Sequence, residues 1–146
     1  MPLTLAQAST IVDLALETGR AANFAPLSVA VLDAGGHLVA FKREDKSGIL
    51  RFEIAFGKAW GSLGMGFGSR DFVERSQKAP VFTGVLSVLS GGRLVPVPGG
   101  VLIRDVGGDV IGAVGISGDT SDRDEACAVA GIAAAGLKAD PGGAKG

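Results

Sequence analysis

The segment 110–116 reads VIGAVGI, and none of its side chains is polar. A strand with one face in water alternates apolar and polar residues, so this segment predicts a strand inside a sheet, with both faces covered or with one face at an interface. The turn sequence DVGG at 105–108 separates it from the β-rich run 101–105. Because glycines supply the positive φ that tight turns need, residues 101–105 and 109–117 are predicted to form a hairpin.

The same D-x-G-G turn occurs once more, as DAGG at 33–36. The β-rich runs 27–33 and 37–43 flank it, which predicts a second hairpin. A fifth, short strand is predicted at 94–97. It is expected at an edge of the sheet, because the prolines in it and just after it have no N–H to donate.

Helical patterns surround the two hairpins. Thr4 and Gln7 form a T-x-x-Q capping box, which predicts a helix over about 4–22. Apolar spacing and end signals predict further helices at 52–64, 71–76, 81–89 and 121–137. The order is therefore α-β-β-α-α-α-β-β-β-α. Since this is not an alternating βαβ pattern, the predicted fold class is α+β, a five-stranded antiparallel sheet with helices packed on it.

The length of 146 residues fits one domain. We expect a single domain over 1–146, with an ordered core at about 4–137 and a frayed tail at 138–146. The 14 basic and 15 acidic residues give a net charge of −1 without a basic patch, which argues against a nucleic-acid partner. No run approaches the roughly 18 apolar residues of a membrane helix, and the N-terminus resembles no secretion signal. With a single cysteine, these features predict a cytoplasmic protein without a membrane partner.

Glycine is unusually frequent, at 24 of 146 residues where ~7% is typical. Many of these glycines lie inside apolar segments, where they weaken a helix, so we expect them to allow close backbone approach to another element, a subunit or a flat ligand. Gly57, Gly61 and Gly64 form a bare stripe on the predicted second helix. Together with the two-faced strand at 110–116, this stripe predicts a homo-oligomer.

Charged residues gather where the second strand leads into the second helix. Lys58 lies among apolar residues, where a lysine loses its proton more easily and suits base or ligand chemistry; alternatively, its stem runs along the helix and its ammonium reaches water. Arg43, Arg51 and Glu53 either hold an anionic ligand or form an ordinary ion-pair network. Lys58 is the candidate catalytic residue, but whether the chain is an enzyme stays open.

His37 is the only histidine, and it follows a turn directly. It is a candidate base or axial haem ligand, or else a polar residue at the strand edge. Two glycine-containing loops have backbone N–H groups that can face a ligand, and they contain Gly99, Gly100, Ser117 and Gly118.

No metal site is predicted. One histidine and one cysteine do not supply a zinc ligand set. Asp119, Asp122 and Asp124 do not have the spacing of a calcium loop, and helix capping explains them. Cys127 follows on the same helix, where it is either a favoured thiolate or a small internal apolar residue, and we expect the latter.

The linked order of these motifs resembles the GlcG/HbpS-like haem-binding family over about 4–137. The motifs are VLDAGGHL at 31–38, RED at 43–45, A-x-x-K-A at 55–59, PGGV at 98–101 and IGAVGISG at 111–118. The resemblance implies a profilin-like sandwich, dimers and larger rings such as octamers, and haem or a related tetrapyrrole as ligand in some members. Other members belong to small-acid catabolism or form the C-terminal domain of corrinoid adenosyltransferases.

Two functions follow as expectations. The first is an oligomeric binding protein for haem or a related flat, anionic small molecule, with one histidine per protomer and therefore weak ligation. The alternative is an enzyme or accessory protein of organic-acid or aromatic catabolism that uses Lys58 with Arg43 or Arg51 against a carboxylate.

Overall fold

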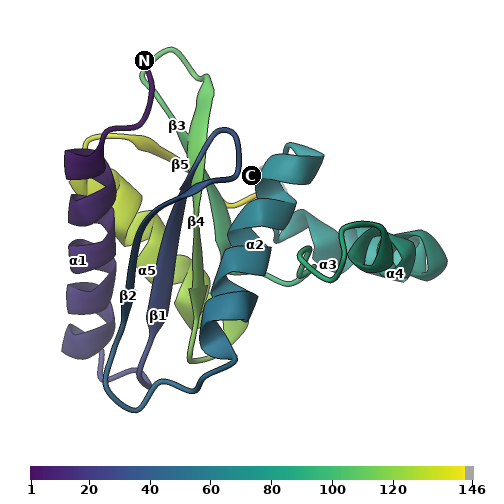
Figure 1. The fold of residues 1–146 in the computed structure, drawn as a ribbon, viewed down its shortest axis with the longest axis horizontal. Helices are drawn as coiled ribbons and strands as arrows, with labels where there is room; N and C mark the ends of the chain where they lie inside the picture. The colour runs from purple at the N-terminus through teal and green to yellow at the C-terminus, as the bar shows by residue number, and fades with distance from the viewer. Residues whose placement is uncertain (144–146) are drawn as a thin grey trace.

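The structure is a computed structural model, and it describes residues 1–143. Five helices and five strands follow one another along the chain (Figure 1). They are α1 (Leu5–Ala21), β1 (Ser28–Asp33), β2 (Leu38–Arg43), α2 (Arg51–Met65), α3 (Asp71–Lys78), α4 (Pro80–Leu89), β3 (Gly100–Arg104), β4 (Val110–Ser117), α5 (Ser121–Ala134) and β5 (Lys138–Asp140).

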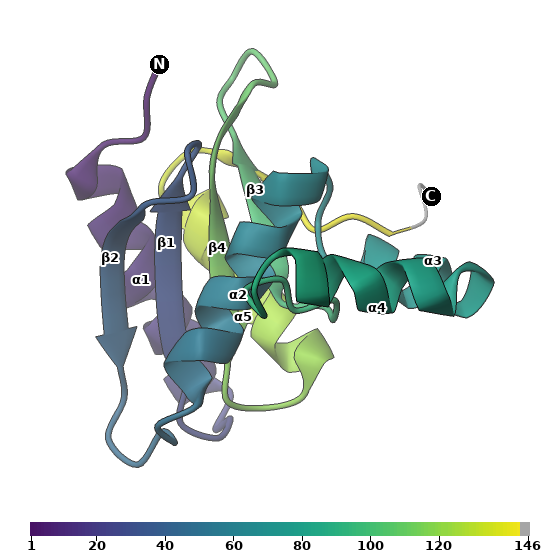
Figure 2. The same ribbon diagram turned by 45° about the vertical axis from the view of Figure 1, so that its right-hand side comes forward.

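The strands form one antiparallel sheet in the order β2-β1-β4-β3-β5. The all-apolar strand β4 lies at its centre, and α1 and α5 cover one face while α2 covers the other (Figures 1 and 2). The predicted α+β class and the five-stranded antiparallel sheet are confirmed. Both faces of β4 are covered within the chain, so its composition requires no interface with another subunit.

The larger part of the core lies between the sheet and the helices α1 and α5, and it includes Val29, Ile116 and Cys127, all fully buried. On the other face, α2 lies directly on β4. A Cβ atom at Gly115 would come within 1.8 Å of the Ala55 carbonyl oxygen. Only glycine allows this approach, which brings the side chains of α2 close to the end of β4.

Both predicted hairpin turns are confirmed. The Gly36 N–H donates to the Asp33 carbonyl oxygen at 3.0 Å, and the Gly108 N–H donates to the Asp105 carbonyl oxygen at the same distance. Both glycines have positive φ, +84° and +93°. The capping box of Thr4 and Gln7 is also present at the start of α1.

The fifth strand differs from the prediction. Residues 94–97 form no strand; instead this segment lies along α2, where the Val95 N–H donates to the Gly57 carbonyl oxygen at 3.2 Å. The fifth strand is β5, which pairs with β3 in the region predicted as a frayed tail. An ion pair between Arg104 and Asp140, 3.0 Å from Nη2 to Oδ2, holds it there. Residues 144–146 of the predicted tail lie outside the described residues.

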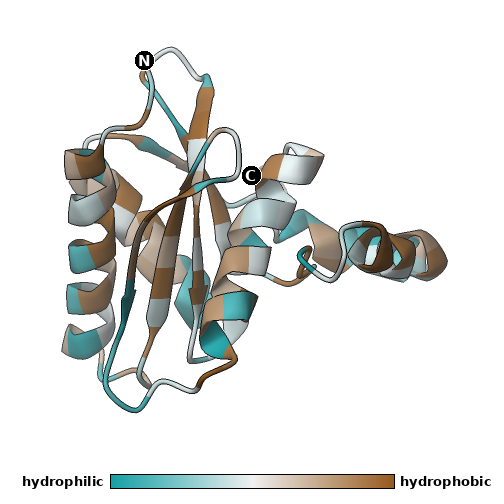
Figure 3. Ribbon diagram, viewed as in Figure 1, coloured by the Kyte–Doolittle hydropathy of each residue, from teal (hydrophilic) through white to brown (hydrophobic). Residues whose placement is uncertain are grey.

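Helices α3 and α4 project from the rest of the molecule and pack chiefly on each other (Figures 1 and 2). Apolar residues run along α4 although much of it faces solvent (Figure 3). Within residues 1–143, no helix is long and apolar enough to cross a membrane.

Candidate functional site

Lys58 points inward from α2 and is only 2% exposed. Its Nζ lies 3.2 Å from Asp124 Oδ2 on α5 and donates to the Ile116 carbonyl oxygen at 2.8 Å. The second oxygen of Asp124 accepts the Asp119 N–H at 3.0 Å. The ammonium is therefore already matched by a buried carboxylate rather than presented to solvent.

Burial lowers the pKa of Lys58, and Asp124 offsets part of this effect. Burial also raises the pKa of Asp124, with Lys58 acting in the opposite direction. Burial thus makes both groups easier to neutralise than they would be in water, as expected for an ion pair removed from solvent. The ion pair between Lys58 and Asp124 links α2 to α5 across the end of the sheet.

Two of the predicted loop glycines enclose this ion pair. Gly99 has φ of +116°, and a Cβ atom there would be 2.8 Å from Lys58 Nζ. The Gly100 N–H donates to Ser69 Oγ at 2.8 Å. The backbone at 99–100 therefore closes over Lys58, and the Gly100 N–H is used within the protein.

Arg51 and Ser117 lie at the same end of the sheet. Arg51 Nη1 donates to Ser117 Oγ at 3.0 Å, where the serine is buried and the arginine half-buried. Gly118 lies tightly against the chain before β1, since a Cβ atom there would be 2.2 Å from the Pro26 carbonyl oxygen. Glu53 is exposed and has no ion-pair partner within residues 1–143.

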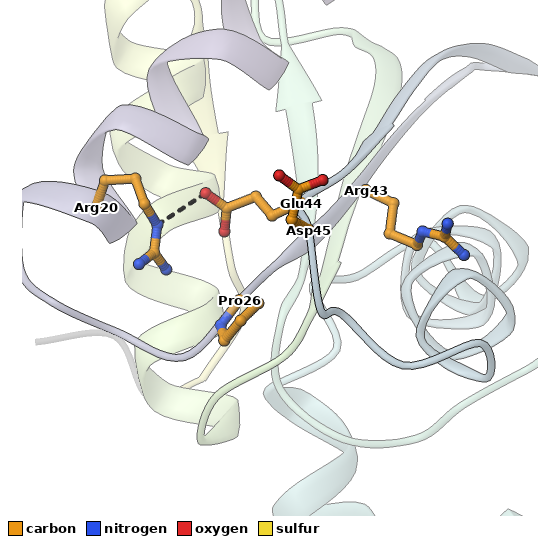
Figure 4. Close-up of a pocket in the computed structure, with 5 residues that line it drawn as sticks. All are labelled: Arg20, Pro26, Arg43, Glu44 and Asp45. Carbon is orange, nitrogen blue, oxygen red and sulfur yellow. Dashed lines mark ion pairs between the residues drawn. The ribbon is translucent and has the colours of Figure 1, made fainter.

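Arg43 borders a pocket of about 390 Å³ beside the start of β1 (Figure 4). Two of the charged groups that line this pocket are already paired: Arg20 Nε lies 2.8 Å from Glu44 Oε2, and Glu44 Oε1 accepts the Leu27 N–H at 2.7 Å. Figure 4 shows the Arg43 side chain directed away from this ion pair. The pocket therefore presents no convergent set of cations.

His37 lies at the opposite end of the sheet, beside the Asp33 end of β1, a strand that spans about 17 Å when fully extended. Its side chain is 80% exposed, and Nδ1 is 3.2 Å from Asp33 Oδ1. The same oxygen accepts the backbone N–H groups of His37 and Gly35, and the first of these contributes most to lowering the pKa of Asp33. A proton on His37 Nδ1 completes the contact and leaves the Nε2 lone pair free, the arrangement typical of metal-binding histidines.

His37 borders a shallow hollow of about 630 Å³ between the two hairpin turns and the N-terminal segment. Apolar side chains provide much of its lining, among them Leu3, Val39 and Ile111. Asp33 and Asp109 contribute carboxylates. We name this feature the His37 hollow.

The predicted site residues thus fall into separate groups. Lys58, Arg51, Ser117 and the loop glycines surround one end of β4, whereas His37 lies at the other end of the sheet. The sequence reasoning missed Asp124 as the partner of Lys58, since it attributed this residue to helix capping. In the described residues, no three metal-binding side chains converge, and Asp122 pairs with Arg70 instead of with its neighbours.

The chain matches the model of a family described as "Haem degrading protein HbpS-like" over residues 3–133. It belongs to this family. Among curated proteins it is similar to an uncharacterized 15.0 kDa protein of Citrobacter freundii from the dhaT-dhaS intergenic region, with 29% identity over 99 residues, which cover 68% of each chain.

Several solved structures have the same fold. The PduOC:heme complex superposes with a TM-score of 0.85 and 25% identity, covering 94% of this chain and 97% of that one. Klebsiella pneumoniae ORFY gives 0.81 and 26%, covering 92% and 90%. A double mutant of Streptomyces reticuli HbpS gives 0.78 and 25%, covering 91% and 86%.

Proposed function

We propose that this HbpS-like chain is an oligomeric binding protein for haem or a related flat, anionic molecule, with His37 as the axial ligand. The observation that carries the proposal is the contact between Asp33 and His37 Nδ1 at the edge of an apolar hollow. The family match and the likeness to a haem complex support it.

The residues of the His37 hollow fit haem in two respects. Its apolar lining suits a porphyrin face, and the exposed imidazole supplies a nitrogen donor. The carboxylates of Asp33 and Asp109 would repel the negatively charged propionates of haem. The propionates would therefore point to solvent. Because the hollow is open, the chain covers only one face of the ligand. A flat ligand held on one face by one histidine is expected to bind weakly.

Within this site each residue has a definite task. Asp33 fixes the imidazole and makes Nε2 a better donor, while the apolar side chains exclude water from one face. Haem, when bound, would supply its iron for ligand exchange and redox chemistry. The proposal covers binding only.

A Soret titration of the purified protein tests the assignment. We expect a modest, substoichiometric shift that His37→Ala reduces strongly, because the variant removes the only imidazole. Asp33→Asn keeps the histidine but removes the carboxylate that orients it, so it should weaken the shift by less.

Lys42→Met is the matched control, since it removes an exposed charge near the Arg43 end of β2, away from the His37 hollow. Its titration should match that of the wild type. If haem binds tightly and His37→Ala changes nothing, His37 is not the ligand.

A carboxylate-binding role for Lys58 is the alternative function. The buried contact with Asp124 does not favour it, because no exposed ammonium is left for a ligand from solvent. The Lys58→Met experiment described below tests it directly.

A further inference from the structure

A second hollow, which shares no lining residue with the His37 hollow, lies where α3 and α4 meet the end of α2. We call it the α3–α4 chamber. Its volume is about 210 Å³, and its lining is almost entirely apolar. Phe72, 1% exposed, is one of its buried walls, and Phe67 packs edge-on against it with ring centroids 5.0 Å apart. Phe82 from α4 also lines the chamber and remains 58% exposed.

Two cations belong to the lining of this apolar chamber, Arg75 and Lys78. The Arg75 guanidinium lies 4.3 Å from the centre of the Phe67 ring. Within residues 1–143, Arg75 forms no ion pair with a carboxylate, whereas Lys78 Nζ lies 2.6 Å from Glu74 Oε1. Arg75 thus keeps its five N–H donors available beside a set of aromatic rings.

We propose that the α3–α4 chamber binds a small aromatic carboxylate. Drug-sized ligands occupy pockets of roughly 300–1,000 Å³, so this smaller chamber suits a single ring. Phenylalanine side chains provide edges and faces against which such a ring packs. The planar guanidinium of Arg75 matches a carboxylate with two parallel hydrogen bonds. The site is separate from the His37 hollow and does not depend on haem.

Benzoate is the probe, with benzyl alcohol as the uncharged compound of similar shape. Backbone amide shifts of the full-length protein, measured in a titration without haem, should saturate with benzoate. They should cluster at residues 65–86. Benzyl alcohol should bind about tenfold more weakly, because a charge-assisted hydrogen bond accounts for about that factor.

Arg75→Met keeps the aliphatic part of the side chain and should weaken benzoate binding about tenfold. Arg75→Lys keeps the positive charge and should bind benzoate with an affinity between those of Arg75→Met and the wild type. Arg93→Met is the control, because it removes the same charge from a guanidinium that lies over Trp60, outside the chamber. Arg93→Met and His37→Ala should both bind benzoate like the wild type.

Three results would overturn the proposal. The first is equal affinity for benzoate and benzyl alcohol, or for the wild type and Arg75→Met. The second is the absence of saturable shifts at residues 65–86. The third is that these shifts follow protein concentration instead of benzoate, which would mean that a second copy of the chain covers the chamber.

Discussion

At the scale of single residues, the contact between Lys58 and Asp124 is the most consequential. Removing two charges from water costs several kcal/mol for each ion, and their attraction and hydrogen bonds compensate for this. Here both side chains are almost fully buried, and the Ile116 carbonyl and the Asp119 N–H complete their hydrogen bonding. Loss of either partner therefore leaves a buried charge without compensation.

Asp124→Asn should lower the free energy of unfolding by about 3–5 kcal/mol at neutral pH, since it isolates the Lys58 ammonium. With its main stabilising partner gone, the pKa of Lys58 should fall further below its ordinary value of 10.5. In that pH range the unfolded chain binds more protons than the folded one, so the stability of the variant should rise with pH. Denaturant unfolding at several pH values measures this.

Lys58→Met is the reciprocal variant. It isolates Asp124, whose pKa is already raised above 3.8 by burial. As the pH falls, Asp124 binds a proton at a higher pH in the folded state than in the unfolded chain. The stability of this variant should therefore rise as the pH falls toward that range. A haem or benzoate affinity that stays unchanged while the melting temperature falls assigns Lys58 a structural role. Equal pH slopes in both variants and the wild type would contradict the coupling.

The sequence permitted only part of this site to be predicted. The unusual position of Lys58 among apolar residues was visible, and so was the single histidine after its turn. The partners of these two residues were not, because Asp124 is 66 positions away and is also a natural helix-start residue. Contacts between residues distant in sequence depend on how α2 and α5 pack, and no local pattern encodes that packing.

At the scale of elements, the glycines of α2 have a more specific role than the stripe suggested. A Cβ atom at Gly57 would be 2.4 Å from the Arg93 carbonyl oxygen, and one at Gly61 would be 2.9 Å from Leu94 Cγ. These glycines therefore admit the segment 93–95 of the same chain. The predicted close backbone approach is confirmed, and the partner of these two glycines is an intramolecular element.

Gly57→Ala should destabilise the protein by about 1–3 kcal/mol, although alanine favours a helix by about 1 kcal/mol, because the backbone at 93 must move. Gly64→Ala is the matched control on the same helix. Its Cβ would lie 3.7 Å from Trp60, an ordinary contact, so it should be neutral or stabilising by up to about 1 kcal/mol. Thermal and denaturant unfolding compare them, and equal effects would refute the packing argument.

Elements with strong local signals were predictable and those without them were not. The capping box, the D-x-G-G turns and the helical spacing located the helices and the four strands of the hairpins. β5 escaped because it is three residues long and contains Lys138 and Asp140, so its strand conformation comes from pairing with β3. Residues 94–97 are β-rich yet pack against α2, which shows tertiary context overriding propensity.

At the scale of the whole molecule, much of the exposed apolar surface of residues 1–143 lies on the projecting helix α4. Its exposed apolar residues are Val81, Phe82, Val85, Val88 and Leu89. A patch of this kind on a helix that projects into solvent is typical of an interaction site. The prediction of a homo-oligomer therefore now rests on the exposed apolar residues of α4, because Gly57, Gly61 and both faces of β4 are covered by other residues of the same chain.

Light scattering at micromolar concentration should return a multiple of 14.6 kDa for the wild type. Val88→Asp should shift the mass toward the monomer, because it buries a charge in an apolar contact. Val106→Asp, at an equally exposed valine in the turn between β3 and β4, should leave the mass unchanged. A wild-type mass near 14.6 kDa would exclude the oligomer.

The edge position of β5 has a consequence for how the protein is made. Every other strand and helix precedes β5 in the chain, so during synthesis β3 can pair with β4 while its outer edge still lacks a neighbour. Until β5 pairs with it, the outer edge of β3, which includes the buried residues Leu102 and Ile103, can pair with a strand of another nascent chain. The outer edge of β3 thus gains its neighbour only after residues 138–140 have been made.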